Sequence, residues 1–399
     1  EEKYSTFKDQ IAINYTKSVS ENIKTGLLTS EYALSLISEY SVQFNKLYKS
    51  NYSEAYWKIL LYPWIVSSIQ LLYERQLMVR TFISQYRNEE LLVNLLEDHL
   101  EINISDTSEL VGEIQQNPIF NHWIFSRIIE ENIPEKWKVN YVPVPLSNVI
   151  KSSTESKLPE KLLGRAYKRV VELIAGNVSN VYGLNVVERI FFSFLVQVKP
   201  PIRAAMTNRV SCNLQAESIK WEFEYRSLLD LLMPSNLLNL DHKTKRFGMK
   251  GKLHLYSNDL YYNVRSKLKA AAHQAQDGLI CPSQHGGYKY GIGYINEVIK
   301  NIEIYHDFFI AWGSSIKQGS KVISLPSPML SKLLNKHKKT VNRIILVSSS
   351  SNYYGARYNS WLPPYYIYEY RDEREELLST LSDEILSTVS YKPYPERRD

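Results

Sequence analysis

Apolar residues recur at three- and four-residue intervals through the first part of the chain, which is the spacing of amphipathic helices. Residues 29–50 follow this spacing, and residues 53–87 continue it over a longer and more apolar stretch. Pro63 interrupts the second stretch. Because proline removes a helix hydrogen bond, we expect a kink or two stacked helices there. The same spacing predicts further helices over residues 88–101 and 115–133.

From about residue 138 the pattern changes to the two-residue alternation that is typical of strands. Residues 138–146 show it first, and residues 218–240 begin with it before a turn at Met233 and Pro234. Short apolar runs that lead into small or polar residues, as parallel strands do, follow at 278–284, 307–313 and 342–352. Helical spacing is found around and between these runs, at residues 261–276, 295–305 and 327–339.

This alternation of strands and helices predicts an open α/β sheet in the C-terminal half. Charge rises and structural signals weaken between residues 235 and 250, which predicts a domain boundary. We therefore expect a helix-rich α/β domain over residues 1–238 and a Rossmann-like domain over residues 239–370. Residues 371–399 are a C-terminal helix and tail, with one amphipathic helix predicted over 372–389.

Composition narrows the classes of function. The chain of 399 residues has 44% apolar and 23% charged residues, which are globular values, and no stretch reaches the ~20 apolar residues of a membrane span. Cys212 and Cys281 offer no disulfide framework and no metal-ligand spacing, which favours a reducing cytoplasm. The net charge of +6 is too scattered to predict a nucleic-acid partner. It suits an anionic ligand or peripheral contact with the inner face of the cytoplasmic membrane.

Glycine and serine gather where the predicted strands end. The chain has 15 glycines, and four of them fall within residues 286–293, directly after His285. Small or hydroxyl residues also follow the other runs, at 313–315 and 348–351. Ligands of open α/β sheets bind beyond the carboxyl ends of the strands, where small residues let backbone N–H groups approach phosphate. We therefore predict a nucleotide or nucleotide-sugar site across these loops. The Walker A and GxGxxG motifs are missing, which counts against an NTPase and a nicotinamide enzyme.

Two of these strand ends carry the motifs of a known family. QHGGYKYG at residues 284–291, followed by EIYHDFFIAWG at 303–313, resembles bacterial surface-polysaccharide transferases that carry QHGG-YG and a later D-x4-WG. The chain is similar in particular to the retaining β-Kdo glycosyltransferases, which transfer Kdo from CMP-β-Kdo onto an O-antigen glycan. WGSS departs from the WGW of many relatives. Further similar segments follow the family's order, at 56–75, 121–129 and 343–363.

The resemblance implies a GT-B-like pair of Rossmann-type domains with CMP bound by the C-terminal one. It implies a reaction without metal or cofactor, with CMP-β-Kdo as the donor and a lipid-linked surface glycan as the acceptor. The sequence has no DxD, no HExxH and no paired Cys/His cluster, so protein groups are expected to stabilise the leaving phosphate. The charged end at residues 391–399 favours a module of a larger multidomain transferase.

Retention of configuration is achieved most simply by two inversions, which require a carboxylate nucleophile. The resemblance implies a catalytic aspartate before the domain boundary, and Asp230 is the candidate, with Asp241 as second choice and a plain helix-face or capping role as the alternative. His285 is the candidate phosphate contact or general acid or base. The candidates for nucleotide binding are Gln284, Gly286, Gly287, Glu303, Gly313, Ser314, Ser348, Ser349, Ser350 and Arg357. The candidates for the sugar carboxylate are Lys243, Lys245 and Arg246.

Three functions remain open on the sequence. They are Kdo transfer from CMP-β-Kdo, transfer from another CMP-nonulosonate or a UDP- or GDP-sugar, and non-catalytic binding of a nucleotide-sugar or glycan. A binding module would need the strand-end loops but not Asp230. Glu155 and Glu160 are candidate second carboxylates. A group of aromatic residues and one histidine either lines the acceptor side or forms a buried core: Tyr56, Trp57, Trp64, His122 and Trp123.

Overall fold

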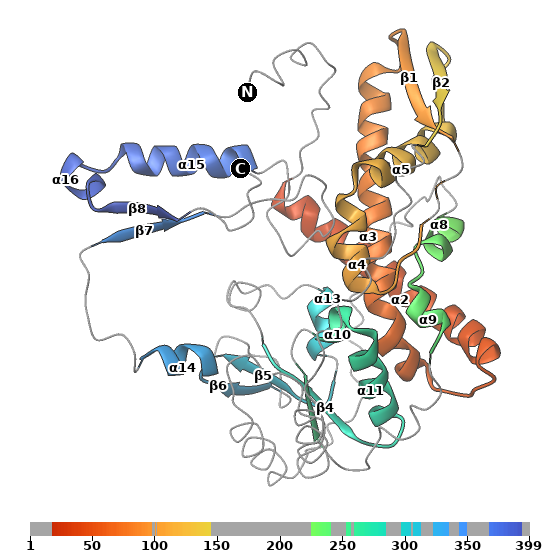
Figure 1. The fold of residues 1–399 in the computed structure, drawn as a ribbon, viewed down its shortest axis with the longest axis vertical. Helices are drawn as coiled ribbons and strands as arrows, with labels where there is room; N and C mark the ends of the chain where they lie inside the picture. The colour runs from red at the N-terminus through yellow and green to blue at the C-terminus, as the bar shows by residue number, and fades with distance from the viewer. Residues whose placement is uncertain are drawn as a thin grey trace.

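A computed structural model gives the fold (Figure 1). It describes residues 18–97, 100, 102–144, 225–240, 253–256, 259–284, 297–304, 306–312, 322–334, 343–348 and 367–392.

Two long helices, α2 (Val19–Leu47) and α3 (Glu54–Tyr86), pack against each other at the centre of the N-terminal part (Figure 1). Ser18 begins α2 through a capping box with Glu21. α3 passes through Pro63 as one helix, so the alternative of two stacked helices is wrong. Nearly every side chain of α3 in its first half is buried, because neighbouring helices cover it on several sides.

A parallel β-α-β unit follows α3. Strand β1 (Leu91–Leu96) pairs in parallel with β2 (Trp137–Val142), and the crossover between them contains three short elements. The strand predicted from residue 138 and the helix predicted over 115–133 are confirmed. The crossover elements are α4 (Thr107–Gly112), η1 (Ile114–Gln116) and α5 (Pro118–Glu130).

The helix predicted over residues 88–101 is wrong, because residues 91–96 form β1. Their sequence, LLVNLL, is a short apolar run that fits a buried strand as well as a helix. Pairing with β2 selects the strand conformation, because all six residues pair with β2, from Leu91 opposite Trp137 to Leu96 opposite Val142. The Ser126 hydroxyl of α5 also accepts a hydrogen bond from the Leu96 N–H at 2.9 Å.

Residues 225–240 lie against the two long helices. They form α8 (Tyr225–Leu231) and α9 (Ser235–Leu238), joined by the predicted turn at Met233 and Pro234. The Trp64 indole donates a hydrogen bond to the Leu232 carbonyl at 2.8 Å, and the Tyr48 hydroxyl donates to the Leu237 carbonyl at 2.6 Å. The strand-like start predicted from residue 218 lies outside the described residues.

The predicted parallel sheet is present in the C-terminal half. β3 (Leu253–Tyr256) pairs in parallel with β4 (Leu279–Pro282), and β5 (Phe309–Trp312) pairs in parallel with β6 (Val322–Leu325). A parallel bridge between Ser283 and Ile310 joins the two pairs, so the strands follow the order β3-β4-β5-β6. The helical elements among them are α10 (Asp259–Tyr262), α11 (Val264–Gln274), α13 (Glu297–Ile299), the π-helical turn η4 (Lys300–Ile304) and α14 (Pro328–Leu334).

The C-terminal residues differ from the single helix predicted over 372–389. They form α15 (Ile367–Ser379), α16 (Asp383–Leu386) and the strand β8 (Val389–Lys392). Ser382 caps the start of α16, which separates the two helices. β8 pairs in parallel with β7 (Ile344–Val347), the third apolar run of the sequence, so a partner distant in the chain decides its conformation.

The fold is mixed α/β, with a helix-rich N-terminal part and short parallel sheets. One apolar core extends across the predicted boundary, because it includes Trp64 of α3 as well as Tyr256 and Ile280 of the β3–β4 pair. The boundary at residues 238 and 239 and the GT-B arrangement stay predictions. None of the helices in the described part of the chain is long and apolar enough to cross a membrane.

Candidate functional site

Asp230 lies at the end of α8 with its side chain exposed to solvent. Its neighbours Leu229 and Leu232 are buried at 2% and 0% exposure and anchor the segment. The Tyr40 hydroxyl of α2 donates a hydrogen bond to Asp230 Oδ1 at 2.8 Å. Within the described residues, Asp230 accepts no further hydrogen bond. The arrangement offers one free carboxylate oxygen on an otherwise fixed side chain.

Tyr40 is buried, with 1% of its surface exposed. Its ring packs edge-on against Trp64, with ring centres 5.3 Å apart. Burial, and then the hydrogen bond to Asp230, raise the pKa of the Tyr40 phenol above its ordinary value, so the hydroxyl stays a donor. The sequence did not indicate this residue. Its only signal was its place on the apolar face of α2, which predicts a core tyrosine.

Gln284 links the end of β4 to β5 by hydrogen bonds at the carboxyl edge of the sheet. Its backbone N–H donates to the Ile310 carbonyl at 2.8 Å, and its side-chain Oε1 accepts from the Trp312 N–H at 2.6 Å. The Asp307 carboxylate accepts from the Ile280 N–H at 2.9 Å near the other end of β4. Gln284, the first residue of QHGG, therefore lies beside the strand that carries residues 307–312 of the second motif. Polar residues of the two motifs hold the two strand ends in register.

Glu303 lies in the π-helical turn η4 and is fully buried at 0% exposure. The turn packs on α3, where the Lys58 ammonium donates to the Asn301 side-chain oxygen at 2.9 Å. His306, directly after the turn, is also buried. π-helical turns are frequent at functional sites, but a buried carboxylate contacts a ribose only after the surrounding side chains move. The role of Glu303 in nucleotide binding therefore stays a prediction.

Ser348 follows β7 and is held by the C-terminal elements. Its backbone N–H donates to the Lys392 carbonyl at 2.9 Å, and its hydroxyl accepts from the Arg374 guanidinium of α15 at 2.9 Å. That guanidinium also lies over the Tyr370 ring, 4.8 Å from its centre. The Ser348 hydroxyl is thus engaged with α15.

Most of the other predicted site residues lie outside the described residues, and their roles stay predictions. They are His285, Gly286, Gly287, Gly313, Ser314, Ser349, Ser350, Arg357, Lys243, Lys245 and Arg246. Asp241, Glu155 and Glu160 lie outside them as well.

The aromatic group of the N-terminal part forms core rather than an acceptor surface. Tyr56, Trp57, Trp64 and Trp123 are at most 4% exposed, and most of them pack on other rings or on apolar side chains. His122 is the exception, because its side chain is exposed and its Nε2 donates to the Asn94 carbonyl at 2.9 Å. The core alternative of the sequence is therefore confirmed for the four aromatic residues.

Lys267 of α11 is a buried cation that the sequence did not single out. It is 0% exposed, and its ammonium donates to the Thr107 hydroxyl of α4 at 3.0 Å. Burial lowers the pKa of Lys267 to about 7, while the nearby Asp106 carboxylate opposes the shift. The sequence spacing could have indicated its burial, because Lys267 falls on the same helix face as the buried Val264 and Ala271. It ties the crossover α4 to the C-terminal sheet.

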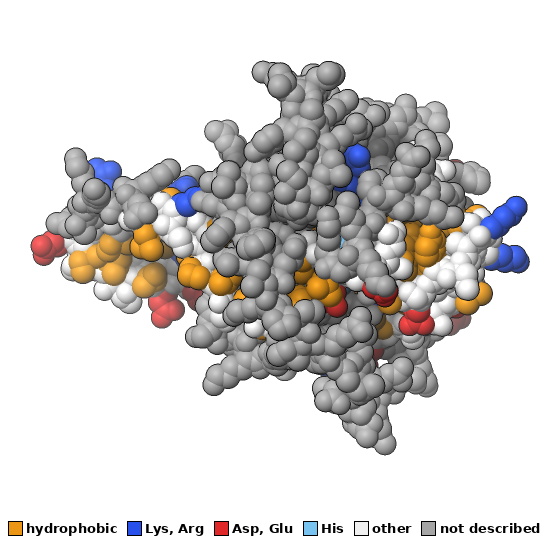
Figure 2. Space-filling view, turned by 90° about the horizontal axis from the view of Figure 1, so that it is seen from below, with side chains coloured by type: hydrophobic (Ala, Val, Ile, Leu, Met, Phe, Trp, Pro, Cys, Tyr) orange, Lys and Arg blue, Asp and Glu red, His pale blue; other side chains and the backbone are white. Residues whose placement is uncertain are grey.

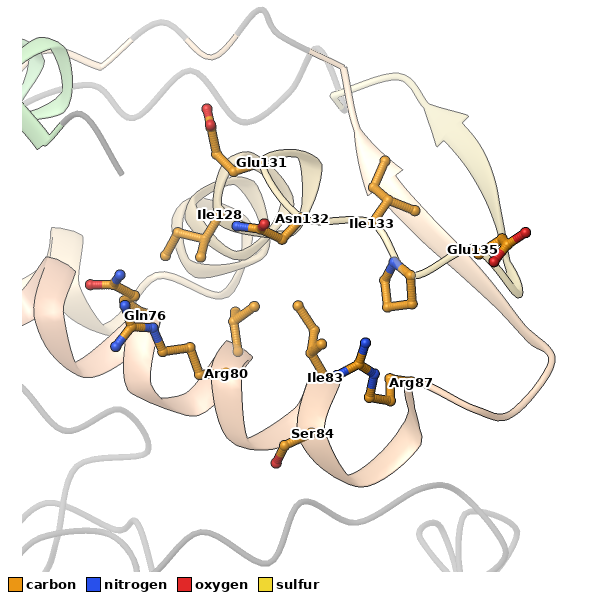
Figure 3. Close-up of a pocket in the computed structure, with 12 residues that line it drawn as sticks. Gln76, Arg80, Ile83, Ser84, Arg87, Ile128, Glu131, Asn132, Ile133 and Glu135 are labelled. Atoms are coloured by element: carbon orange, nitrogen blue, oxygen red, sulfur yellow. The ribbon is translucent and has the colours of Figure 1, made fainter. Parts of the chain in front are cut away.

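A concave surface that Asp230 does not line lies at the end of α3. A cavity of about 460 Å³ separates the last turns of α3 from the loop after α5. Figure 3 shows Arg87 and Ile83 on one wall, opposite Ile128 and Asn132, with the Glu131 carboxylate pointing away.

Figure 2 shows one face of the molecule, where basic and acidic side chains of the described residues lie scattered among apolar ones rather than in a stripe. Within the described residues, no three His, Cys, Asp or Glu side chains gather as a metal site.

Comparison with known proteins places the chain in a family. Neither the curated proteins nor the solved structures include a match to it. The match to the LIC12162 family transferases covers residues 1–399, the whole chain. The protein described here therefore belongs to the LIC12162 family of transferases.

Proposed function

We propose that the protein is a retaining glycosyltransferase that moves Kdo from CMP-β-Kdo onto a bacterial surface glycan through a covalent intermediate on Asp230. Membership of a transferase family supports the reaction class. The donor, the acceptor and the mechanism are our proposal, drawn from the QHGG and D-x4-WG resemblance.

The observation that carries the proposal is the state of the Asp230 carboxylate. One oxygen is held by Tyr40 at 2.8 Å, and the side chain is otherwise exposed. A nucleophile needs a fixed orientation and an accessible lone pair, and this carboxylate has both. A capping residue would instead bond to backbone N–H groups at a helix start, whereas Asp230 lies at the end of α8.

The reaction follows in two balanced steps. In the first, Asp230 Oδ2 bonds to the anomeric carbon while the bond from that carbon to the phosphate oxygen breaks, and CMP leaves with the electron pair. In the second, an acceptor hydroxyl oxygen bonds to the same carbon, the ester bond to Asp230 breaks, and the hydroxyl proton passes to a base. Each step inverts the carbon, so the configuration is retained.

The carboxyl edge of the β3–β6 sheet is the proposed site for the CMP phosphate. Gln284 and Trp312 hold two strand ends together at 2.6 Å, and His285, Gly286 and Gly287 continue directly from Gln284. Backbone N–H groups beside small residues are suitable donors to a leaving phosphate. His285 is the proposed additional donor, because imidazole titrates near neutral pH.

Mass spectrometry of the intact protein tests the nucleophile. Mixed with CMP-β-Kdo and no acceptor, the wild-type chain is expected to gain the mass of one Kdo, on a peptide that contains Asp230. Asp230→Asn is expected to gain none, whereas Asp372→Asn, which changes an exposed aspartate of α15, is the matched control and keeps the adduct. An adduct on another residue, or full glycan transfer by Asp230→Asn, contradicts the proposal.

Nucleotide-dependent thermal stability tests the donor. A ligand that binds only the folded state raises the melting temperature, so CMP is expected to raise it and UDP and GDP are not. Stabilisation by UDP or GDP instead of CMP would favour a different sugar donor. No response to any of the three would remove the strand-end site from the proposal.

A further inference from the structure

The contact between Tyr40 and Asp230 joins residues that are 190 positions apart in the chain. Tyr40 is on α2 of the N-terminal part, and Asp230 is on α8, which packs beside α3 (Figure 1). A hydroxyl-to-carboxylate hydrogen bond of 2.8 Å is short enough to orient the acceptor. With one carboxylate oxygen held this way, rotation of the Asp230 side chain is restricted.

Tyr40 is itself fixed by its surroundings. It is 1% exposed, and its ring packs edge-on against Trp64, the residue whose indole donates to the Leu232 carbonyl at 2.8 Å. Trp64 thus supports Tyr40 from one side and the turn after α8 from the other. This network fixes the donor hydroxyl and the backbone of the acceptor together, so the position of the carboxylate does not depend on a mobile side chain.

We propose that Tyr40 is a positioning residue, which holds Oδ1 of Asp230 so that Oδ2 faces the donor sugar. The inference rests on the proposed function of Asp230. The same hydrogen bond acts in the second step. When the ester bond to the sugar breaks, its electron pair returns to the Asp230 carboxylate, and the Tyr40 hydroxyl stabilises that charge. Tyr40 therefore assists both formation and breakdown of the glycosyl-enzyme.

Tyr40→Phe tests the inference, because it removes the hydroxyl and keeps the ring packed on Trp64. The kcat for glycan transfer is expected to fall by about tenfold to a hundredfold, the range that a mispositioned reacting group costs. The KM for CMP-β-Kdo is expected to change little, because Tyr40 is 1% exposed and acts through Asp230. The glycosyl-enzyme is expected to persist longer after acceptor is added.

Tyr48→Phe is the matched control. Tyr48 directly follows the last residue of α2, and its hydroxyl donates to the Leu237 carbonyl of the same docked segment at 2.6 Å. If Tyr40 only anchored residues 225–240, Tyr48→Phe would lower kcat as much as Tyr40→Phe does. Equal effects of the two variants, or an unchanged kcat in Tyr40→Phe, overturn the inference.

Asp230→Glu supplies a second measurement that does not depend on the folding of Tyr40→Phe. It keeps a carboxylate and moves it by one methylene away from the position that Tyr40 holds, so kcat is expected to fall at least as far as in Tyr40→Phe. Wild-type turnover in Asp230→Glu contradicts positioning. Full transfer by Asp230→Asn removes the proposed nucleophile itself, whereas an inactive Asp230→Asn beside a normal Tyr40→Phe removes only the role of Tyr40.

Discussion

The α2–α3 core and the carboxyl edge of the β3–β6 sheet are built in different ways. The core consists of apolar side chains that lie close together in the sequence, such as Leu60, Trp64 and Leu71 on one helix. The edge depends on single polar contacts between strands, above all that between Gln284 and Trp312. Burial of apolar area gives the core its stability, whereas the edge gains register from a few directional hydrogen bonds. Asp230 lies against the core, on α8, whereas Gln284 lies at the sheet edge.

The comparison predicts that the largest loss of stability comes from the core. Trp64→Ala removes a fully buried indole, the edge contact to Tyr40 and the hydrogen bond to the Leu232 carbonyl. The free energy of unfolding is expected to fall by about 3–5 kcal/mol, which urea denaturation measures. Leu92→Ala, at a leucine that is 69% exposed, is the control and is expected to leave it unchanged. A loss below about 1 kcal/mol for Trp64→Ala would contradict its central place in the core.

Lys267 joins α11 to α4 through Thr107, and the cost of burying its ammonium depends on pH. Burial lowers its pKa to about 7, below the ordinary value of 10.5, so at pH below 7 both the folded and unfolded states are protonated and the full cost of burying the charge is present. Between pH 7 and 10.5 only the unfolded state keeps the proton, so stability rises with pH by up to about 1.4 kcal/mol per unit from this group.

Lys267→Met removes that dependence. The variant is expected to be more stable than wild type at pH 7, with the difference shrinking toward pH 10, as urea unfolding at several pH values would show. Lys138→Met, at an exposed lysine of β2, is the control and is expected to follow the wild-type pH profile. A Lys267→Met protein that is less stable at pH 7 would mean that the bond to Thr107 outweighs the cost of burial.

A smaller loss of stability is expected from a substitution at the sheet edge. Gln284→Ala removes the acceptor of the Trp312 N–H, and the free energy of unfolding is expected to fall by about 1–3 kcal/mol. The stabilisation by CMP is expected to weaken with it, because the β4 and β5 ends lose their register. Gln284→Glu keeps an acceptor oxygen but adds a negative charge at a position that is 4% exposed, so the stabilisation by the anionic CMP is expected to weaken at least as much as in Gln284→Ala. If Gln284→Ala lost CMP binding without losing stability, Gln284 would be a ligand contact rather than a strand tie.

The smallest effect is expected at the start of α2. Ser18→Ala removes the capping box with Glu21 and is expected to lower the free energy of unfolding by about 1 kcal/mol, without changing transfer. Ser35→Ala, at an exposed serine within the same helix, is the control. A change in kcat would indicate that α2 transmits the position of its first turn to Tyr40.

Periodicity predicted the elements whose own residues repeat a helical or strand spacing clearly enough. The helix over 53–87, the helix over 115–133, the strand from 138 and the strand–helix alternation of the C-terminal half are present. The helix predicted over 29–50 is present too, but it begins earlier, at Val19, where Ser18 caps it. The predictions failed at β1 and at the end of the chain, where short segments pair in parallel with strands 46 and 45 residues away, as between Leu91 and Trp137 or Ile344 and Val389. A run of four to six residues carries too little period to choose between helix and strand without its partner.

The same division holds for the candidate site. The sequence made Asp230 and Gln284 candidates, one as an isolated carboxylate in an apolar segment and one through the QHGG motif. Tyr40 and Lys267 were not, because a buried tyrosine and a basic residue on a helix are common and have no motif. Their contacts join α2 to α8 and α11 to α4, and no local pattern contains such pairs.

By itself, the sequence determined which residues form the apolar helices and where the apolar runs end in small residues, and its match over the whole chain determined the membership of the LIC12162 family of transferases. These properties depend on local spacing and composition, which can be read directly from the sequence. Only the tertiary structure decided that Gln284 ties β4 to β5 and that Tyr40 holds one oxygen of Asp230. Both contacts depend on packing between segments distant in the chain, and a hydrogen bond forms only where folding brings a donor and an acceptor within about 3 Å.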